Sequence, residues 1–183
     1  MGAIARRQWQ TVNRNNDNKE NPMTESGTAS SAEARLKELG IDLPELPVPV
    51  ANFALWRRDR DLVFLSGQVC EWNGPVTHTG KLGEVHDLAA GQAAARICGL
   101  NLLAVLRHAL GGSLDPVSGC MRVGGFVHCT PSFPSVPMVI NGASDLFHDI
   151  FGAETGAHAR TAVGVMQLPK NAAVEVDAIF RVG

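Results

Sequence analysis

The stretch HARTAVGVMQLPKNAAVEVDAIFRV, from His158 to Val182, contains two runs of small and apolar residues joined by a short Leu-Pro-Lys-Asn link. Runs of this composition predict two β-strands. Two charges interrupt them, Arg160 in the first run and Glu175 in the second. Because an unpaired charge is costly to bury, each either faces water or has a specific partner. Taken alone, a solvent-facing position is the commoner case for both.

The remainder of the chain supplies the other elements of a sheet and its helices. Asp87 is placed to cap a long helix that ends at Gly111, and apolar residues cover most of the circumference of this helix, so we expect it to be buried. The order of elements predicts an α+β fold, with helices on one face of a mostly antiparallel sheet. The other predicted elements are a helix over 32–40, a hairpin over 53–58 and 62–67, a strand near Val76, a strand over 120–129 and a helix over 134–151.

Length and composition fit one domain with a sizeable core. The 183 residues are 45% hydrophobic and 19% charged, which is ordinary for a globular protein. Residues 1–30 are polar, with few bulky apolar side chains, so we expect a flexible tail in front of a domain over 31–183. Met23 is an alternative start, which leaves open whether residues 1–22 belong to the native protein.

Charge and apolar patterning argue against several classes of partner and cofactor. The net charge of −2 gives no general attraction to phosphate backbones, so nucleic acid is not an expected partner. The most apolar run, around 100–106, is too short to span a bilayer. The four cysteines lack a C-x-x-C pair, which favours reduced thiols and a cytoplasmic location. The six histidines show no metal-ligand spacing, so we expect neither a metal nor an organic cofactor.

Three segments resemble one known family. They are LVFLSGQV over 62–69, NGASDLF over 141–147 and, most specifically, HARTAVGVMQLPKNAAVEVDAI over 158–179. They are similar to segments of the RidA family of reactive intermediate deaminases, also called the YjgF family, and resemble a less-characterised bacterial branch of it. The resemblance covers about Leu36 to Val182. It implies a chorismate-mutase-like fold, a homotrimer and sites in clefts between subunits.

The same resemblance implies a reaction and roles for particular residues. Archetypal members hydrolyse enamine and imine intermediates to 2-oxo acids and ammonia. By resemblance, Arg160 holds the substrate carboxylate, helped by the backbone N–H of Ala162, and Glu175 positions or activates the attacking water. Gly67 is expected to line the substrate site, where a glycine permits close approach. An imine carbon is already electrophilic, so orientation, a water molecule and a base suffice without a cofactor.

Two positions depart from the family pattern and bear on the substrate. Phe53 stands where a tyrosine is common, so a hydroxyl that would orient substrate or water is missing. Phe133, in the PSF segment over 131–133, replaces a more polar segment and makes the expected site more apolar. Both are expected to contact the substrate, whose identity the sequence leaves open.

A simple hairpin of the last two strands predicts how Arg160 and Glu175 are related. With a turn near Lys170 and Asn171, Arg160 lies opposite about residue 181, and Glu175 lies six residues along the partner strand on the same face, about 20 Å away. One small substrate cannot contact both within a chain. A neighbouring subunit must therefore complete the site, or Glu175 is not catalytic.

Three functions are consistent with these features. The first is a cytoplasmic, homotrimeric imine or enamine deaminase that acts on small imino acids. The second is a non-catalytic protein that binds small carboxylates on the same fold. The third is an endoribonuclease, which older naming of the family suggests, but the net charge of −2 and the lack of a basic, aromatic stripe count against it.

Overall fold

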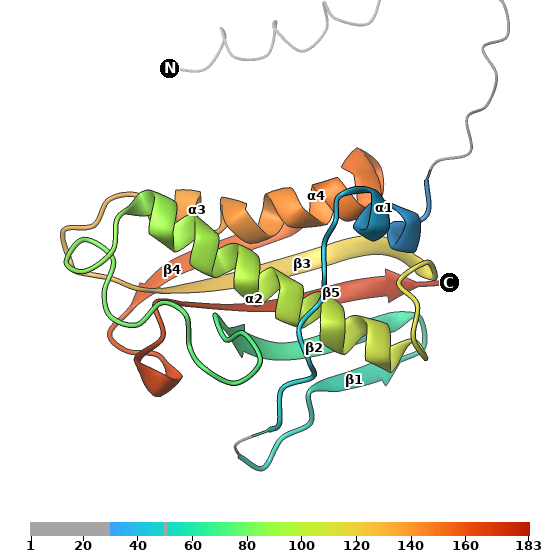
Figure 1. Ribbon diagram of the computed structural model, residues 1–183, viewed down its shortest axis with the longest axis horizontal. Helices are drawn as coiled ribbons and strands as arrows, with labels where there is room; N and C mark the ends of the chain where they lie inside the picture. Colours follow the sequence, from blue (N-terminus) through green and yellow to red (C-terminus); the bar gives the residue numbers. More distant parts are fainter. Residues whose placement is uncertain (1–29, 50) are drawn as a thin grey trace, which may run out of the picture.

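The computed structural model describes residues 30–49 and 51–183, and five strands form one sheet (Figure 1). Their order across the sheet is β1-β2-β5-β3-β4. Neighbouring strands are antiparallel except β3 and β4, which are parallel. The predicted tail over 1–30 lies almost wholly outside the described residues. The strands are β1 (Trp56–Asp59), β2 (Leu62–Val69), β3 (Val117–His128), β4 (Ala159–Val165) and β5 (Val174–Val182).

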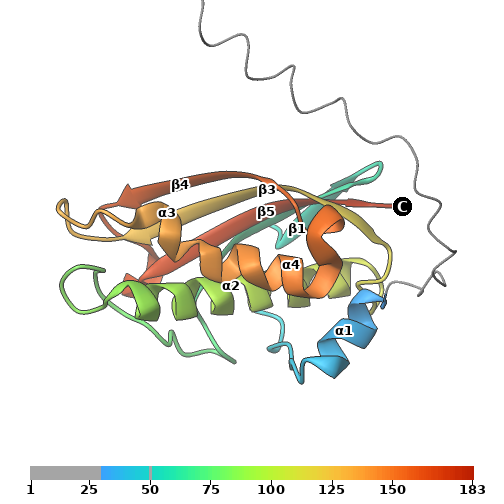
Figure 2. The same ribbon diagram turned by 90° about the horizontal axis from the view of Figure 1, so that it is seen from above.

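The helices lie on one side of the sheet, as Figure 2 shows. α2 (Leu88–Ala109) and α4 (Asn141–Thr155) pack against each other, α3 (Val136–Val139) leads into α4, and α1 (Ala32–Glu38) contacts α4. A short 3₁₀ helix, η1 (Pro169–Asn171), lies between β4 and β5. The predicted α+β class, with helices on one face of a mostly antiparallel sheet, is confirmed.

Local sequence explains where α2 begins and how closely α4 packs on it. The Asp87 side chain accepts a hydrogen bond from the backbone N–H of Ala90 and caps α2, as its position predicted. At Gly142, the second residue of α4, a Cβ atom would stand 1.9 Å from the carbonyl oxygen of Gln92 in α2. Glycine is therefore required for the observed approach of the two helices.

The alternation along β5 gives the sheet one core face and one open face. Every second residue from Val174 to Val182 is buried, on the face that the helices cover. Glu175 and Asp177 lie between them and point to the other face. No described helix covers that face (Figure 2), and the exposed fractions of Phe64 and Val163 there are 42% and 41%. The open face is therefore partly apolar.

The hairpin predicted for the last two strands is wrong. β5 lies between β2 and β3, whereas β4 pairs with the outer edge of β3 and runs parallel to it. The Leu-Pro-Lys-Asn link therefore belongs to a crossover past β3, since a tight turn cannot join strands on either side of a third one. The strand predicted near Val76 is reduced to one isolated bridge with Glu71.

α2 is long and apolar enough, by length and composition alone, to cross a membrane. In the structure it packs on the sheet and on α4, and 61% of its most apolar window is buried. Packing inside the domain therefore accounts for its composition.

Candidate functional site

Glu175 lies on the open face of β5 directly beside Gly67 of β2. A Cβ atom at residue 67 would stand 2.0 Å from Oε1 of Glu175, so the carboxyl group occupies the space that any side chain there would need. The pairing of β2 with β5 shifts register between Leu65 and Gln68, around this glycine. The close approach expected at Gly67 is therefore present: the absence of a side chain at residue 67 makes room for the Glu175 carboxyl group beside the β2 backbone.

The surroundings of Glu175 disfavour its ionised form. Partial burial raises the pKa of the Glu175 carboxyl above its ordinary value, and the nearby Asp177 carboxylate raises this pKa further. Among residues 30–49 and 51–183, no hydrogen-bond donor or basic side chain contacts the Glu175 carboxyl group. A carboxyl with a raised pKa is a stronger proton acceptor than a fully solvated one, as a general base requires.

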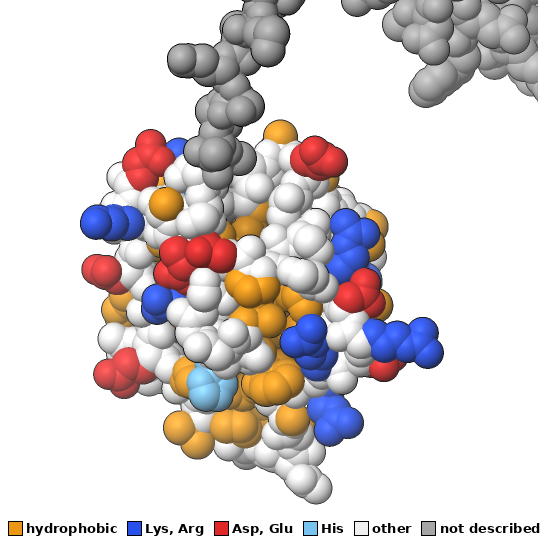
Figure 3. Space-filling model, turned by 90° about the vertical axis from the view of Figure 1, so that its right-hand side faces the viewer, with side chains coloured by type: hydrophobic (Ala, Val, Ile, Leu, Met, Phe, Trp, Pro, Cys, Tyr) orange, Lys and Arg blue, Asp and Glu red, His pale blue; other side chains and the backbone are white. Residues whose placement is uncertain are grey.

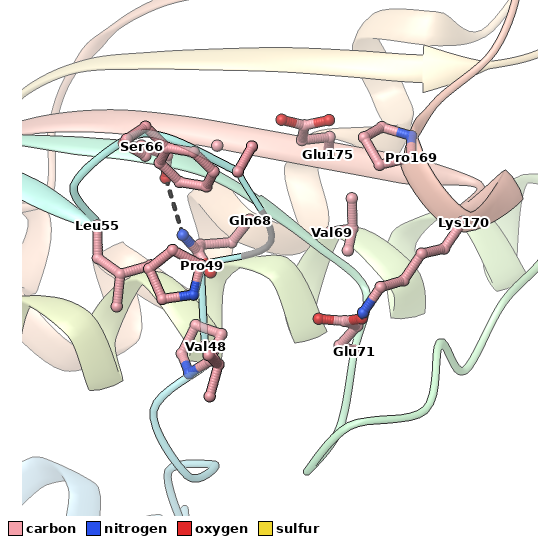
Figure 4. A pocket seen from close by; sticks show the side chains of 14 residues that line it. Val48, Pro49, Leu55, Ser66, Gln68, Val69, Glu71, Pro169, Lys170 and Glu175 are labelled. Atoms are coloured by element: carbon pink, nitrogen blue, oxygen red, sulfur yellow. Dashed lines mark hydrogen bonds and ion pairs between the residues drawn. The ribbon is translucent and has the colours of Figure 1, made fainter.

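Glu175 lines a cavity of about 360 Å³ (Figure 4). The walls come from the segment before β1, from the second half of β2 and from η1. Gly67 and Phe53, both predicted as site residues, share this cavity with Glu175. Most of the lining is apolar, with Val48, Phe53, Leu55 and Val69 among its members.

An ion pair forms part of the cavity wall. Lys170 of η1 reaches back to the Glu71 carboxylate, as Figure 4 shows. The pair balances the charge of Glu71, so Glu175 is the carboxyl group that remains without a cationic partner in the described part of this cavity. Glu175 is therefore the residue best placed to exchange protons with a bound molecule.

Arg160 lies on β4 and points toward α4. Its Nη1 atom donates to Oδ1 of Asn141 at 2.9 Å and to Oγ of Ser144 at 3.0 Å. Within the described chain, no carboxylate lies within ion-pair distance of Arg160, and its Nε and Nη2 atoms have no acceptor. Nε and Nη2 form one edge of the guanidinium, which can bind a carboxylate through two parallel hydrogen bonds.

Arg160 and Glu175 point to opposite faces of the sheet. Arg160 is in register with Val123, and Val123 with Ala178, whose side chains are buried beneath the helices. Glu175 is three residues from Ala178 and so faces the other way. Two strand spacings and this offset place the two backbones about 14 Å apart. The predicted partner residue, the shared face and the distance of 20 Å are wrong, but one small substrate still cannot contact both residues.

The other two predicted site residues lie along β4. Ala162 follows Arg160 by two residues and therefore shares its face on this edge strand. Phe133 lines a second cavity, of about 410 Å³, together with Gly164 and Val165 near the end of β4. The predicted residues thus form two groups: Glu175, Gly67 and Phe53 around the first cavity, and Arg160, Ala162 and Phe133 along β4.

Sequence reasoning missed several contacts of these two groups. Asn141 and Ser144 are three residues apart on α4, and this helical spacing could have indicated that both face one partner. His158, the residue just before β4, contacts Ser144, and its place two residues before Arg160 was a weak signal. The ion pair of Lys170 with Glu71 joins residues 99 positions apart and leaves no local pattern.

Comparison with known proteins identifies the family. A family model described as "YjgF/chorismate mutase-like, putative endoribonuclease" matches residues 33–180. The chain belongs to the YjgF family. The protein TCP17 of Trypanosoma cruzi is 43% identical over 146 residues, which are 80% of this chain and 91% of that protein. The family predicted from three short segments is thus confirmed.

Solved structures agree with this YjgF-family assignment. A protein of unknown function from Agrobacterium tumefaciens is 40% identical, has a TM-score of 0.77, and aligns over 83% of this chain and 92% of its own. A "putative endoribonuclease" from Shewanella oneidensis is 30% identical with a TM-score of 0.80, over 83% and 99% of the two chains. TdcF of Escherichia coli, solved with bound serine, has a TM-score of 0.54 at 19% identity over 78% and 99% of the chains, which shows the shared fold.

Proposed function

We propose that this YjgF-family protein is a cofactor-independent imine and enamine deaminase whose sites are shared between the subunits of a homotrimer. One observation carries the proposal: the chain holds two incomplete half-sites. The first is the guanidinium edge of Arg160, which has no anionic partner among residues 30–49 and 51–183. The second is the Glu175 carboxyl, with its raised pKa, in an otherwise largely apolar cavity. A carboxylate anchor and a base are what the hydrolysis of an imino acid needs.

The open face of the sheet supports assembly. Phe64 and Val163 are exposed there, and β4 is an edge strand with unpaired backbone groups. In a closed trimer, each interface joins one surface of a subunit to a different surface of the next. Such an arrangement brings Arg160 of each subunit toward Glu175 of a neighbour and forms three equivalent sites.

The chemistry is hydrolysis of a 2-imino acid, R–C(=NH)–COO⁻, to a 2-oxo acid and ammonia. Arg160 binds the carboxylate, while Glu175 accepts a proton from water as the water oxygen attacks the imine carbon. That proton passes to the nitrogen. In the resulting amino alcohol, Glu175 transfers the hydroxyl proton to the NH2 group, which leaves as ammonia while the C–N bond breaks and the C=O bond forms. The atoms balance as one imino acid and one water giving one oxo acid and one ammonia.

The lining of the Glu175 cavity favours substrates with an apolar side chain. Val48, Phe53 and Leu55 present no hydrogen-bonding side-chain groups, and polar substituents would lose their hydration against them. We therefore propose 2-imino acids with branched or aromatic side chains as better substrates than the small imine derived from serine.

Two substitutions test the separate roles of Arg160 in binding and Glu175 in proton transfer. Imines are generated in situ by an amino acid oxidase, and ammonia release is followed with wild type, Arg160→Lys and Glu175→Gln, together with 2-oxobutyrate binding by calorimetry. Arg160→Lys should weaken binding, since an ammonium group cannot reproduce the two-pronged contact. Glu175→Gln should retain most binding and lose about 10²- to 10⁴-fold in turnover, because an amide cannot accept the proton of water. Wild-type turnover by Glu175→Gln would contradict the mechanism.

The Arg160 contacts also favour a second candidate, a non-catalytic carboxylate-binding protein. The hydrogen bonds that orient Arg160 come from α4 and do not involve Glu175. Arg160 is therefore oriented to bind a carboxylate whether or not Glu175 acts as a base. Binding of 2-oxobutyrate that depends on Arg160, with no imine hydrolysis by any variant, would favour this candidate over the deaminase.

The endoribonuclease reading has less support. The family description and the descriptions of two solved relatives use that word. The face of the molecule in Figure 3 carries acidic as well as basic side chains around exposed apolar ones, and the whole chain has a net charge of −2. RNA binding usually needs a concentrated basic surface. RNA cleavage that is lost in Glu175→Gln would favour this third reading.

A further inference from the structure

A chain of three hydrogen bonds runs from Arg160 to the backbone of the α4–β4 loop. Arg160 Nη1 donates to Ser144 Oγ at 3.0 Å, Ser144 Oγ lies 2.9 Å from His158 Nε2, and His158 Nδ1 lies 2.7 Å from the carbonyl oxygen of Gly156. Ser144 is 6% exposed, so its hydroxyl has little access to water that could replace these partners. The chain links α4 to β4 beside the Arg160 half-site.

The direction of each hydrogen bond follows from the end of the chain. The Gly156 carbonyl can only accept, so His158 carries its proton on Nδ1. In a neutral imidazole the other nitrogen is then an acceptor, and Ser144 donates its O–H to Nε2. The lone pairs of Ser144 Oγ are left to accept the N–H of Arg160. Every donor in the chain thus has one acceptor, provided that His158 is neutral.

The surroundings of His158 favour the neutral ring. Burial lowers the pKa of His158, and electrostatic repulsion from the neighbouring His148 and Arg160 side chains lowers this pKa further, while the hydrogen bond to Gly156 opposes these effects. The His148 ring from α4 lies 5.8 Å away between centroids, and the Phe147 ring meets His158 edge-on at 6.2 Å. Glu154 and Arg181 are charged residues that line the same shallow cavity as His158.

We propose that Ser144 and His158 are positioning residues that hold Arg160 in the orientation needed to bind a carboxylate. Nη1 is fixed to α4 by Asn141 and Ser144, so rotation of the guanidinium is restricted and the opposite edge, Nε with Nη2, is presented to the ligand. His158 acts one step further away by orienting the Ser144 hydroxyl. This inference rests on the proposed function, because it assigns the ligand of Arg160 as the carboxylate of a 2-imino or 2-oxo acid.

A double-mutant cycle separates positioning from general stability. Ser144→Ala should weaken 2-oxobutyrate binding about fivefold in the wild-type background, the effect of losing one hydrogen bond. In the Arg160→Lys background it should have almost no further effect, because the group that it positions is gone. Ser113→Ala is the matched control, since the Ser113 hydroxyl accepts from the backbone N–H of Asp115 at 3.1 Å in the loop between α2 and β3, and binding should be unchanged.

The role of His158 needs its own pair of variants. His158→Leu removes the acceptor of the Ser144 proton and should weaken binding as much as Ser144→Ala. His158→Gln supplies a side-chain oxygen in its place and should restore part of the affinity. Two results would overturn the proposal. One is an equal loss of 2-oxobutyrate affinity in His158→Leu and His158→Gln. The other is a loss of affinity from Ser144→Ala that is the same in the wild-type and Arg160→Lys backgrounds.

Nuclear magnetic resonance of ¹⁵N-labelled histidine tests the geometry without any ligand. At neutral pH, His158 should be the neutral Nδ1–H tautomer, the Nε2 resonance should shift in Ser144→Ala, and Arg160→Gln should raise the pKa of His158. An Nε2–H tautomer or an Nε2 resonance insensitive to Ser144→Ala would overturn the positioning role. If these signals behave as expected but no form binds 2-oxobutyrate, the proposed function fails while the hydrogen-bond chain to Arg160 stands.

Discussion

Arg160 and Glu175 lie two strands apart and on opposite faces of the same sheet. Arg160 lies on the edge strand β4. Its Nη1 atom is hydrogen-bonded to α4, and the other edge of its guanidinium is free. Glu175 lines a cavity at the open face, where its carboxyl group has no cationic partner in the described chain. Each residue is therefore available for an interaction that the described part of its own chain does not provide, and this relationship is the basis of the proposed shared site.

Gly67→Ala should remove most imine hydrolysis and leave the fold intact. The added methyl group would overlap Oε1 of Glu175, and this flexible carboxyl end can swing away, so the protein tolerates the change but loses the placement of its base. We expect a fall in turnover of about 10²-fold, within the usual contribution of a general base. Gly119→Ala on β3 is the control, because its nearest atoms would be 3.4 Å from the added Cβ. Unchanged turnover in Gly67→Ala would argue that the seating of Glu175 is unimportant.

Glu175→Gln should raise the melting temperature at neutral pH. Because the pKa of Glu175 is raised in the folded chain, the unfolded chain loses this proton more readily, and stability falls as pH rises from the ordinary carboxyl pKa through the folded pKa. The amide does not ionise and avoids this cost. We expect a gain of about 2 °C at pH 7 that shrinks toward pH 4.5, measured by scanning calorimetry. A stabilisation that is the same at both pH values would point to a cause other than ionisation.

Gly142→Ala should destabilise the domain through the contact between α4 and α2. The added Cβ would meet backbone atoms of Gln92 and Arg96, which cannot turn away as a side chain can, so the two helices must separate. Overpacking of this kind costs about 1–3 kcal/mol in the free energy of unfolding, measurable by urea titration. Gly119→Ala again provides the comparison, and a Gly142→Ala protein as stable as wild type would show that the helices can shift at little cost.

Local pattern was sufficient for most of the fold. The cap at Asp87 and the glycines after α2 marked the long helix, and the alternation from Val174 to Val182 marked β5 and its buried face. The pairing of strands could not be obtained in this way, because the partner of β4 is chosen by packing across the whole sheet. The sequence around Lys170 suits a tight turn as well as a crossover, which is why the hairpin model placed Arg160 on the wrong face.

The site was predictable to the extent that single residues carry a chemical signature. Glu175 and Arg160 are charges in apolar strands, and Gly67 is a glycine in a strand, so each was conspicuous in the sequence. Ser144 and His158 are ordinary polar residues, and their importance arises only because the fold brings α4 and the start of β4 together at Arg160. The ion pair of Lys170 with Glu71 could not be predicted for the same reason.

Mixing two inactive variants tests the shared site most directly. Arg160→Gln and Glu175→Gln subunits are unfolded together in equal amounts, refolded and assayed for imine hydrolysis, with light scattering used to establish that the product is a trimer. If Arg160 of one subunit works with Glu175 of the next, sites with both native residues re-form at random interfaces, and about one quarter of wild-type activity should return. Each variant refolded alone should stay inactive. Mixed trimers with no more activity than the separate variants, or a monomeric mass for the wild type, would contradict the shared site.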